Sequence, residues 1–317
     1  MSDERETGAR AVEPPRPAPR RSSRVAINGW VNLDKPVGVA STQAVAQLKR
    51  FFNAKKVGHA GTLDPLATGV LPVAFGEATK AVPIVQDGVK AYQFTVKWGE
   101  ETDTDDAEGR VAARSPRRPT RAEIEAATPR FVGLINQTPP IFSAIRIAGE
   151  RAYDLARDGE TFAIAARPVF IHRLALIEAE ADQASFAAEC GKGAYVRALA
   201  RDLGRALGCL GHVVALRRTR VGPFVIDDAA PLEALRRSAE ARAAALLRVE
   251  AGLAELPRLA VDRNGAAALR RGQKLLLRGA EAPGEGPAYA ACLGAPVAFG
   301  AVEDGYFVST RVFNLPE

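Results

Sequence analysis

The 317-residue sequence is poor in cysteine and histidine, and this scarcity excludes several kinds of protein. Its three cysteines, Cys190, Cys209 and Cys292, are odd in number and far apart, so they predict neither a disulfide framework nor a paired metal motif. The three histidines are equally scattered and lack the spacing of a zinc site. We therefore predict no metal site and a reducing, cytoplasmic location.

Long apolar runs are also missing, as are the usual nucleotide-binding loops. No stretch approaches the length that a membrane span requires. A G-x-x-x-x-G-K-[ST] loop is absent, and the glycines near Cys190 lack the dinucleotide-binding spacing, so we predict no cofactor. The net charge of +6 and the pI of about 9.4 favour an acidic partner. Composition does not choose among nucleic acid, anionic lipid and no specific partner, and it favours nucleic acid only modestly.

The first part of the chain changes from a polar tail to a globular pattern. Residues 1–25 mix prolines with arginines and hold no apolar block for a signal peptide, so we expect a disordered tail. We expect this tail to be a solvated extension without a defined role; the alternative is that its arginines contact RNA. Further on, residues 30–33, 70–75 and 92–98 are predicted strands, and Ser41 is predicted to cap a helix with an apolar face.

The rest of the pattern predicts a mixed α+β fold. Helices are expected at residues 121–131, 152–157 and 196–207 with strands between them, which differs from regular βαβ alternation. An alanine- and arginine-rich helix over residues 232–247 precedes Pro257, where we place a domain boundary. Beyond it, short strands broken by glycines predict a compact barrel; they span residues 288–293, 296–302 and 307–312.

The segment G-T-L-D-P-L-A-T-G, residues 61–69, places one acidic side chain in a glycine-bracketed loop. Pro65 disfavours helical dihedrals at Asp64, so the carboxylate should project from extended backbone. Gly61 and Gly69 allow another chain to approach closely. For an isolated Asp-Pro pair, a simple turn would be the better interpretation.

This loop resembles the catalytic motif of the bacterial tRNA pseudouridine synthases of the TruB family. Five further segments resemble the family in the expected order, so the likeness extends from about Asn28 to the C-terminus. They are G-W-V-N-L-D-K-P (29–36), Y-Q-F-T-V-K-W-G with T-D-T-D-D (92–106), P-P-I-F-S-A-I-R (139–146), C-G-K-G-A-Y-V-R-A-L-A-R-D-L-G (190–204) and L-R-R-T-R-V-G-P-F (216–224).

The resemblance implies an α+β fold: a catalytic domain built on a mixed, largely antiparallel sheet, and a small β-barrel-like PUA domain at the C-terminus. The expected boundaries are residues 1–25 for the tail, 26–254 for the catalytic domain and 255–317 for the PUA-like, RNA-binding domain. The resemblance also implies an isomerase that needs neither cofactor nor metal.

The resemblance assigns the catalytic role to Asp64, as nucleophile or general base toward the sugar. It pairs Arg197 with that carboxylate, and a guanidinium so placed can lower an aspartate pKa; a surface charge on a helix is the alternative for Arg197. Tyr92 is expected to stack on an extruded base and Leu216 to flank it, with ordinary core packing as the alternative for both.

Four further residues are predicted to bind RNA. The resemblance places His59 beside the flipped nucleotide, so we assign it binding rather than proton transfer. Lys35, Lys56 and Lys192 are predicted RNA contacts. The acidic segment at residues 100–108 argues against RNA binding, because its carboxylates should repel phosphate. Turn formation and pairing with arginines of the same chain are alternative roles for it.

The expected activity is conversion of uridine to pseudouridine at position 55 in the T loop of tRNA. We expect a monomer without an obligate protein partner, which contacts the T arm and, through its C-terminal domain, the acceptor side. Two alternative functions stay open. The protein could be an RNA glycosidase, which would need a second carboxylate to activate water. It could also be a tRNA-folding chaperone, for which catalysis is incidental.

Overall fold

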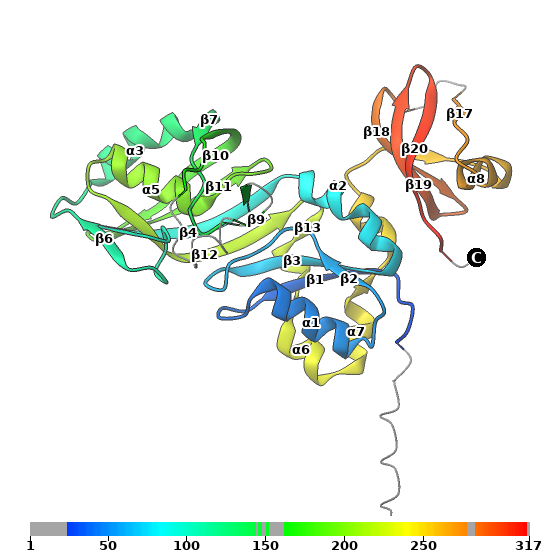
Figure 1. Ribbon diagram of the computed structural model, residues 1–317, viewed down its shortest axis with the longest axis horizontal. Helices are drawn as coiled ribbons and strands as arrows, with labels where there is room; N and C mark the ends of the chain where they lie inside the picture. Colours follow the sequence, from blue (N-terminus) through cyan, green and yellow to red (C-terminus); the bar gives the residue numbers. More distant parts are fainter. Residues whose placement is uncertain (1–23, 144, 148–149, 152–161, 278–282, 316–317) are drawn as a thin grey trace, which may run out of the picture.

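The computed structural model describes residues 24–143, 145–147, 150–151, 162–277 and 283–315 (Figure 1). A long central sheet carries helices at both ends, and a smaller sheet is formed by the C-terminal residues. Nearly all of the predicted tail, residues 1–25, lies outside the described residues, and so does the helix predicted at residues 152–157. None of the described helices is long and apolar enough to cross a membrane.

The central sheet has eleven strands. They are β1 (Gly29–Lys35), β2 (Val57–His59), β3 (Thr68–Phe75), β4 (Lys90–Trp98), β7 (Gly133–Gln137), β10 (Arg167–Ala179), β11 (Gln183–Cys190), β12 (Gly211–Val221), β13 (Phe224–Val225), β14 (Ala230–Pro231) and β15 (Leu246–Leu247). The main order is β14-β1-β3-β12-β4-β11-β10-β7, so β12 inserts between two strands that come much earlier in the chain. Only β1 with β14 and β12 with β3 pair in parallel among the described strands of this sheet.

Alternate residues of β1 and β3 enter two different cores because successive side chains of a strand point to opposite faces. Val31 and Val73 belong to the first core, whereas Trp30 and Ala74 belong to the second. The first core is covered by α1 (Ser41–Phe51), α3 (Arg121–Ala127), α5 (Val196–Ala206) and α6 (Leu232–Arg237). The second is closed by η1 (Gly76–Ala81), α2 (Val82–Asp87) and η4 (Val249–Leu253).

The predicted strands at residues 30–33, 70–75 and 92–98 are confirmed as β1, β3 and β4. Phe94 and Trp98 of β4 are buried while Gln93 and Lys97 are exposed, as the alternation predicts. The predicted helices at residues 121–131 and 196–207 are also found, the first as α3 followed by the 3-10 turn η2 (Thr128–Phe131) and the second as α5.

Two helix predictions were wrong in detail. The helix α1 has Ala40, not Ser41, at its cap, because the Ser41 hydroxyl is used elsewhere. The long helix expected over residues 232–247 is broken at Ser238, whose backbone is extended and whose side chain caps α7 (Ala239–Ala245). The chain then leaves the helix to pair with β1 as β15. Pairing with the sheet therefore overrides the helix propensity of the alanines.

A second, curled sheet follows Pro257. Its order is β16-β18-β19-β20-β17, with α8 (Arg263–Arg270) packed against it. The strands are β16 (Arg258–Ala260), β17 (Leu275–Leu276), β18 (Gly286–Cys292), β19 (Ala295–Glu303) and β20 (Tyr306–Val312). The fold class predicted from the sequence, α+β with a mixed, largely antiparallel sheet and a small C-terminal β unit, is confirmed.

The last described residues join this sheet to η1 and the second core. Phe313 is 1% exposed and packs in the second core. Beside it, the Lys80 ammonium donates to the Val312 carbonyl at 2.7 Å, and the Asn314 N–H donates to the Glu77 carboxylate at 2.5 Å. An apolar contact and two polar ones thus join η1 to the end of the chain.

Candidate active site

The Asp64 loop connects β2 to β3 and is anchored by two buried side chains. The Ser41 hydroxyl donates to the Leu63 carbonyl and accepts from the Leu63 N–H, both at 2.8 Å. Lys35, fully buried, donates to the carbonyls of Val39 at 2.7 Å and Pro65 at 3.5 Å. Because these contacts flank Asp64 on both sides, the loop holds the carboxylate in a defined place.

Arg197, the second residue of α5, binds the Asp64 carboxylate. Its Nε lies 2.9 Å from Asp64 Oδ2, and the guanidinium is buried while the Asp64 side chain is 37% exposed. The remaining N–H groups donate to the carbonyls of Thr104 and Phe142, each at 2.9 Å, and Nη1 lies 3.4 Å from Asp106 Oδ2. The structure thus brings Asp64 and Arg197 together, and Asp64 keeps an accessible edge.

The pKa of Asp64 is raised above the usual value for aspartate. Burial is the largest cause, and the nearby Asp106 carboxylate adds to it. The cations of Arg197 and Lys35 act in the opposite direction without outweighing burial. The expected lowering of this pKa by Arg197 is therefore present as one contribution, but it does not decide the direction.

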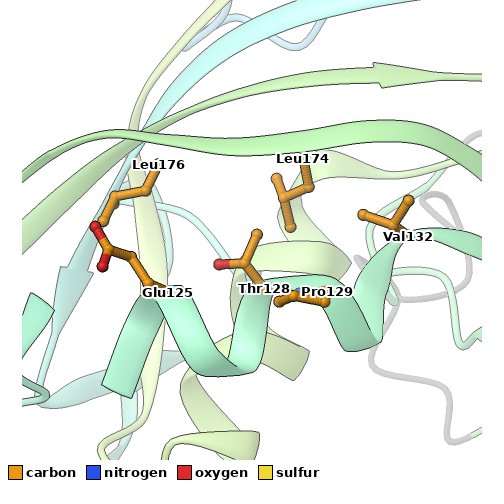
Figure 2. Close-up of a pocket in the computed structure, with 6 residues that line it drawn as sticks. All are labelled: Glu125, Thr128, Pro129, Val132, Leu174 and Leu176. Atoms are coloured by element: carbon orange, nitrogen blue, oxygen red, sulfur yellow. The ribbon is translucent and has the colours of Figure 1, made fainter. Parts of the chain in front are cut away.

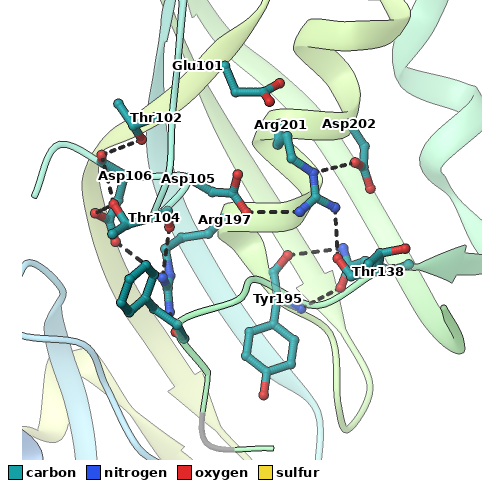
Figure 3. Close-up of polar contacts among 12 residues, drawn as sticks. Glu101, Thr102, Thr104, Asp105, Asp106, Thr138, Tyr195, Arg197, Arg201 and Asp202 are labelled. Carbon is teal, nitrogen blue, oxygen red and sulfur yellow. Dashed lines mark hydrogen bonds and ion pairs between the residues drawn. The ribbon is translucent and has the colours of Figure 1, made fainter. Parts of the chain in front are cut away.

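The acidic segment 100–108 faces the arginines of α5 (Figure 3). Residues 197, 201 and 205 are four apart and so share one helix face. Arg201 contacts Asp105 at 2.9 Å, and Arg205 contacts Glu101 at 2.6 Å. Both roles left open for this segment are found: it pairs with arginines of the same chain, and it forms turns, in which the Asp105 N–H donates to the Thr102 carbonyl at 3.2 Å.

Asp106 is buried and serves as the support of Arg197. Its Oδ1 accepts from the Thr104 hydroxyl at 2.6 Å and from the Glu108 N–H at 3.0 Å, while Oδ2 faces Arg197. With its oxygens engaged in this way, Asp106 has no free edge toward a substrate. Sequence reasoning missed this role, although the T-D-T-D-D motif lies within the resemblance.

Tyr92 and Leu216 lie on the neighbouring strands β4 and β12. Leu216 pairs with Phe94 in the strand register and is 8% exposed. Tyr92 pairs with Arg218 and packs at the edge of the first core. Burial raises the pKa of the Tyr92 hydroxyl to about 12, and the negative charge of Asp64 contributes to this rise. The hydroxyl is thus neutral near neutral pH and within the electrostatic reach of Asp64.

His59 lies on β2, just before the loop. Burial lowers its pKa, and the positive charge of Arg218 lowers it further. Its Nδ1 is buried and has no hydrogen-bond partner among the described residues. A histidine kept neutral in this way suits binding better than proton donation.

The three lysines predicted to bind RNA occupy different settings. Lys35 is 0% exposed, and its ammonium is taken up by loop carbonyls, which argues against the predicted RNA contact and assigns it to loop support. Burial is also the main reason that its pKa falls to about 8. Lys56 is exposed, and Lys192 is exposed and pairs with Asp87 at 2.6 Å.

Arg218 is the other site residue that sequence reasoning missed. It lies two residues beyond Leu216 on β12, so strand alternation places both on one face. Its guanidinium is 3% exposed and donates to the carbonyls of Gly61, Thr62 and Val70 at 3.0, 3.2 and 2.8 Å. These three carbonyls belong to the two ends of the Asp64 loop.

A separate hollow of about 520 Å³ lies between α3, η2 and β10 (Figure 2). Its lining is mostly apolar and comes from elements that hold none of the site residues: Glu125, Thr128, Pro129, Val132, Leu174 and Leu176. Within the described part of the chain, no group of three or more His, Cys, Asp or Glu could hold a metal ion. The carboxylate and guanidinium pair therefore defines the candidate site.

Two family models match consecutive parts of the chain. Residues 49–196 match the family model described as the TruB family pseudouridylate synthase N-terminal domain, and residues 197–254 match the tRNA pseudouridylate synthase B C-terminal domain. The tRNA pseudouridine synthase B of Bradyrhizobium diazoefficiens is 58% identical over 93% of this chain and 88% of its own. That of Rhodopseudomonas palustris is 58% identical over 94% and 83%.

Solved structures are similar at lower identity. A Cbf5-Nop10-Gar1 complex contains a chain with a TM-score of 0.70 and 25% identity, covering 90% of this chain and 83% of that one. A chain of an H/ACA RNP bound to a substrate RNA containing 2'-deoxyuridine gives a TM-score of 0.71 at 25% identity, with coverages of 91% and 85%.

Proposed function

The chain belongs to the TruB family and is a pseudouridine synthase that isomerises uridine in tRNA, and we propose that it acts at position 55 of the T loop with Asp64 as its catalytic residue. The observation that carries this proposal is the 2.9 Å contact between Arg197 and Asp64 in a loop braced on both sides.

Asp64 acts on the ribose of the target nucleotide, as nucleophile or as general base. The reaction breaks the bond between the ribose and uracil N1, turns the uracil and forms a bond from the ribose to C5. C5 then loses its hydrogen as a proton and N1 takes up a proton, so the reaction is a redox-neutral isomerisation. A carboxylate serves in either role only when ionised. Arg197 and Lys35 support the ionised form against the effect of burial.

The target base leaves its stack and enters the space beside Tyr92 and Leu216. Extrusion costs a few kcal/mol, which stacking on an aromatic ring offsets. Tyr92 supplies the ring, and Leu216 supplies an apolar neighbour on the adjacent strand. His59, neutral and just before the loop, packs against the distorted nucleotide.

Recognition rests on the shape of the T arm and on its splayed loop bases. Lys56 and Lys192 are exposed and are assigned to phosphate contacts. The catalytic domain corresponds to residues 26–254, and the curled sheet within residues 255–317 acts as a PUA-like domain that touches the acceptor side. Its docking through Phe313 supports a fixed spacing between the two contacts.

The glycosidase rival requires a second carboxylate that is free to activate water. Asp106 is close, but its oxygens are occupied by Thr104, Glu108 and Arg197. Glu108 lies at the surface. Partial desolvation of its carboxylate, together with the nearby carboxylates of Asp106 and Asp64, raises its pKa. A glycosidase would thus have to use Glu108 as the carboxylate that activates water.

The experiment compares Asp64→Asn with Glu108→Gln on tRNA that carries tritium at uridine C5. We expect no detectable tritium release from Asp64→Asn, with tRNA affinity within about threefold of the unaltered protein because phosphate contacts dominate affinity. Glu108→Gln should release tritium normally and free no uracil. Activity in Asp64→Asn would refute the proposal, and free uracil that depends on Glu108 would establish the glycosidase. A parallel loss of binding and turnover in Asp64→Asn would argue for misfolding or for a purely structural role of Asp64.

A further inference from the structure

We infer that Arg218 is a positioning residue for the isomerisation, which closes both ends of the Asp64 loop and orients Tyr92 with the same guanidinium. The inference rests on the proposed roles of Asp64 and Tyr92. Arg218 acts through these two residues and does not itself contact the reacting atoms.

One planar group joins two distant points of the loop. Nη2 and Nη1 donate to the carbonyls of Gly61 and Thr62, where the loop begins, and Nε donates to Val70, just after it ends. A guanidinium holds its donors in a fixed fork, whereas an ammonium is a single point. The separation of the loop ends is therefore set by the geometry of Arg218.

The glycines at the two ends of the loop serve this contact in different ways. Gly69 has a φ of +98°, and a Cβ there would lie 2.2 Å from the Arg218 carbonyl oxygen, so only glycine lets β12 come this close. Gly61 has a φ of +100°, which favours glycine, and a Cβ there would be in ordinary contact with Arg218 Nη1 at 3.4 Å. Gly69 thus makes room for Arg218, and Gly61 supplies the left-handed backbone at the start of the loop.

The other partner of Arg218 is Tyr92. The two residues lie directly opposite each other in the register of β12 and β4, and the guanidinium interacts with the Tyr92 hydroxyl. Since the loop and Tyr92 are tied to one group, Arg218 determines how far the Asp64 carboxylate lies from the tyrosine ring. That separation must match the ribose and the base of one nucleotide.

The setting of Arg218 differs from that of an ordinary structural arginine. Its charge is buried, and among the described residues it forms no ion pair with a carboxylate, so carbonyls and the phenol oxygen are its compensation. Burying an unpaired charge is costly, and an apolar side chain would fill the same space more cheaply. A requirement for defined geometry explains the guanidinium better than packing does.

The test compares Arg218→Lys with Arg220→Lys in the full-length protein. Arg220 lies on the same strand and bonds to Gly222 and Glu255, away from the loop. Because small misplacements of reacting groups cost about 100-fold in rate, we expect Arg218→Lys to lower the single-turnover rate by about that factor. Its tRNA Kd should stay within about threefold, since phosphate contacts dominate affinity. Arg220→Lys should match the unaltered protein.

A double-mutant cycle with Tyr92→Phe tests the path through the hydroxyl. We expect Arg218→Lys to cost clearly less in the Tyr92→Phe background, because one of its contacts is already gone. Additive losses, a rate within about threefold of normal in folded Arg218→Lys, or a loss of binding parallel to the loss of rate would each overturn the inference.

If Arg218→Lys fails to fold, the contacts can be measured in protein with an intact Arg218. With ¹⁵N-labelled arginine, Tyr92→Phe should shift the Arg218 Nη resonances and speed the solvent exchange of the Nη–H groups severalfold, while the Nε–H stays protected by its bond to the Val70 carbonyl. Unchanged Nη resonances and Nη–H exchange would overturn the inference. Asp64→Asn distinguishes a wrong role for Arg218 from a wrong proposed function. If it is inactive while folded Arg218→Lys is normal, only the inference fails; if it is active, the proposed function fails.

Discussion

Asp64 and Asp106 share one guanidinium: Arg197 Nε lies 2.9 Å from Asp64 Oδ2, and Arg197 Nη1 lies 3.4 Å from Asp106 Oδ2. Asp106 is 2% exposed and is held by its own hydrogen bonds, whereas Asp64 keeps an exposed edge. The buried aspartate therefore fixes the arginine, and the arginine fixes the exposed aspartate. Burial, with a further contribution from the Asp106 carboxylate, raises the pKa of Asp64 although Arg197 and Lys35 oppose the rise.

The first prediction concerns the acid limb of the pH profile. The proposed step needs ionised Asp64, and the pKa of Asp64 is raised, so the single-turnover rate should begin to fall at a higher pH than for an ordinary aspartate. Arg197→Gln removes an opposing cation and should move this limb to still higher pH. Asp106→Asn removes a like charge and should move it to lower pH. Shifts of the same sign in both variants would contradict this account of the site.

The second prediction separates the ring of Tyr92 from its hydroxyl. Tyr92→Ala should slow turnover by about 10- to 100-fold, because stacking of a base on an aromatic ring contributes about 1–3 kcal/mol. The tRNA Kd should change much less, because phosphate contacts dominate affinity. Tyr92→Phe keeps the ring and should lose less rate. Equal losses of rate and affinity in Tyr92→Ala would argue for a purely structural role.

The high pKa of Tyr92 leads to a third prediction. Burial raises this pKa to about 12, so the hydroxyl stays protonated up to at least pH 10. We therefore expect Tyr92→Phe to leave the alkaline side of the single-turnover profile unchanged in position. A limb between pH 8 and 10 that vanishes in Tyr92→Phe would show that the hydroxyl titrates in this range.

The fourth prediction compares two glycines with left-handed backbones. Gly69→Ala combines backbone strain with a clash against the Arg218 carbonyl, so we expect unfolding to become easier by about 3 kcal/mol or more. Gly272 has a φ of +76° with nothing within 4 Å of a Cβ, so Gly272→Ala should cost only about 1–2 kcal/mol. Chemical unfolding of both variants measures the difference, and equal costs would disprove the close approach of β12 to the loop.

The fifth prediction concerns the joint between the two sheets. Phe313→Ala deletes a ring that is 1% exposed and should lower the free energy of unfolding by about 3–5 kcal/mol. The matched variant Val308→Ala, 38% exposed on β20, should change it by less than about 0.5 kcal/mol. Calorimetry should show the C-terminal sheet unfolding earlier in Phe313→Ala. A single unshifted transition would mean that this ring does not secure the joint.

Sequence reasoning succeeded where the information is local. The alternation in β4 and the helix at α5 follow from side-chain periodicity, and the motif around Asp64 marks the loop. It failed where a distant segment competes for a local feature. The Ser41 hydroxyl leaves its expected cap because Leu63 offers both a donor and an acceptor. The helix predicted at residues 232–247 ends early because β15 pairs with β1.

The pairing of the acidic segment with the arginines of α5 could not be predicted from the sequence, again because the partners are distant in the chain. Arg201 and Asp105 are 96 residues apart in the chain, and no local pattern shows that α5 meets the acidic segment. A count of charges alone makes residues 100–108 an obstacle to RNA binding, whereas their pairing turns several of them inward onto Arg197, Arg201 and Arg205. Only the folded arrangement shows that these acids serve the arginines.

The insertion of β12 between β3 and β4 has a consequence for synthesis on the ribosome. While the nascent chain lacks β12, the two earlier strands have no neighbour between them, and neither Leu216 nor Arg218 is present. The central sheet can close only after this late segment emerges, and such long-range pairing is slow to form. The nascent chain should therefore be unable to modify RNA until β12 has been translated and has left the ribosome. Activity then begins only late in the synthesis of the protein.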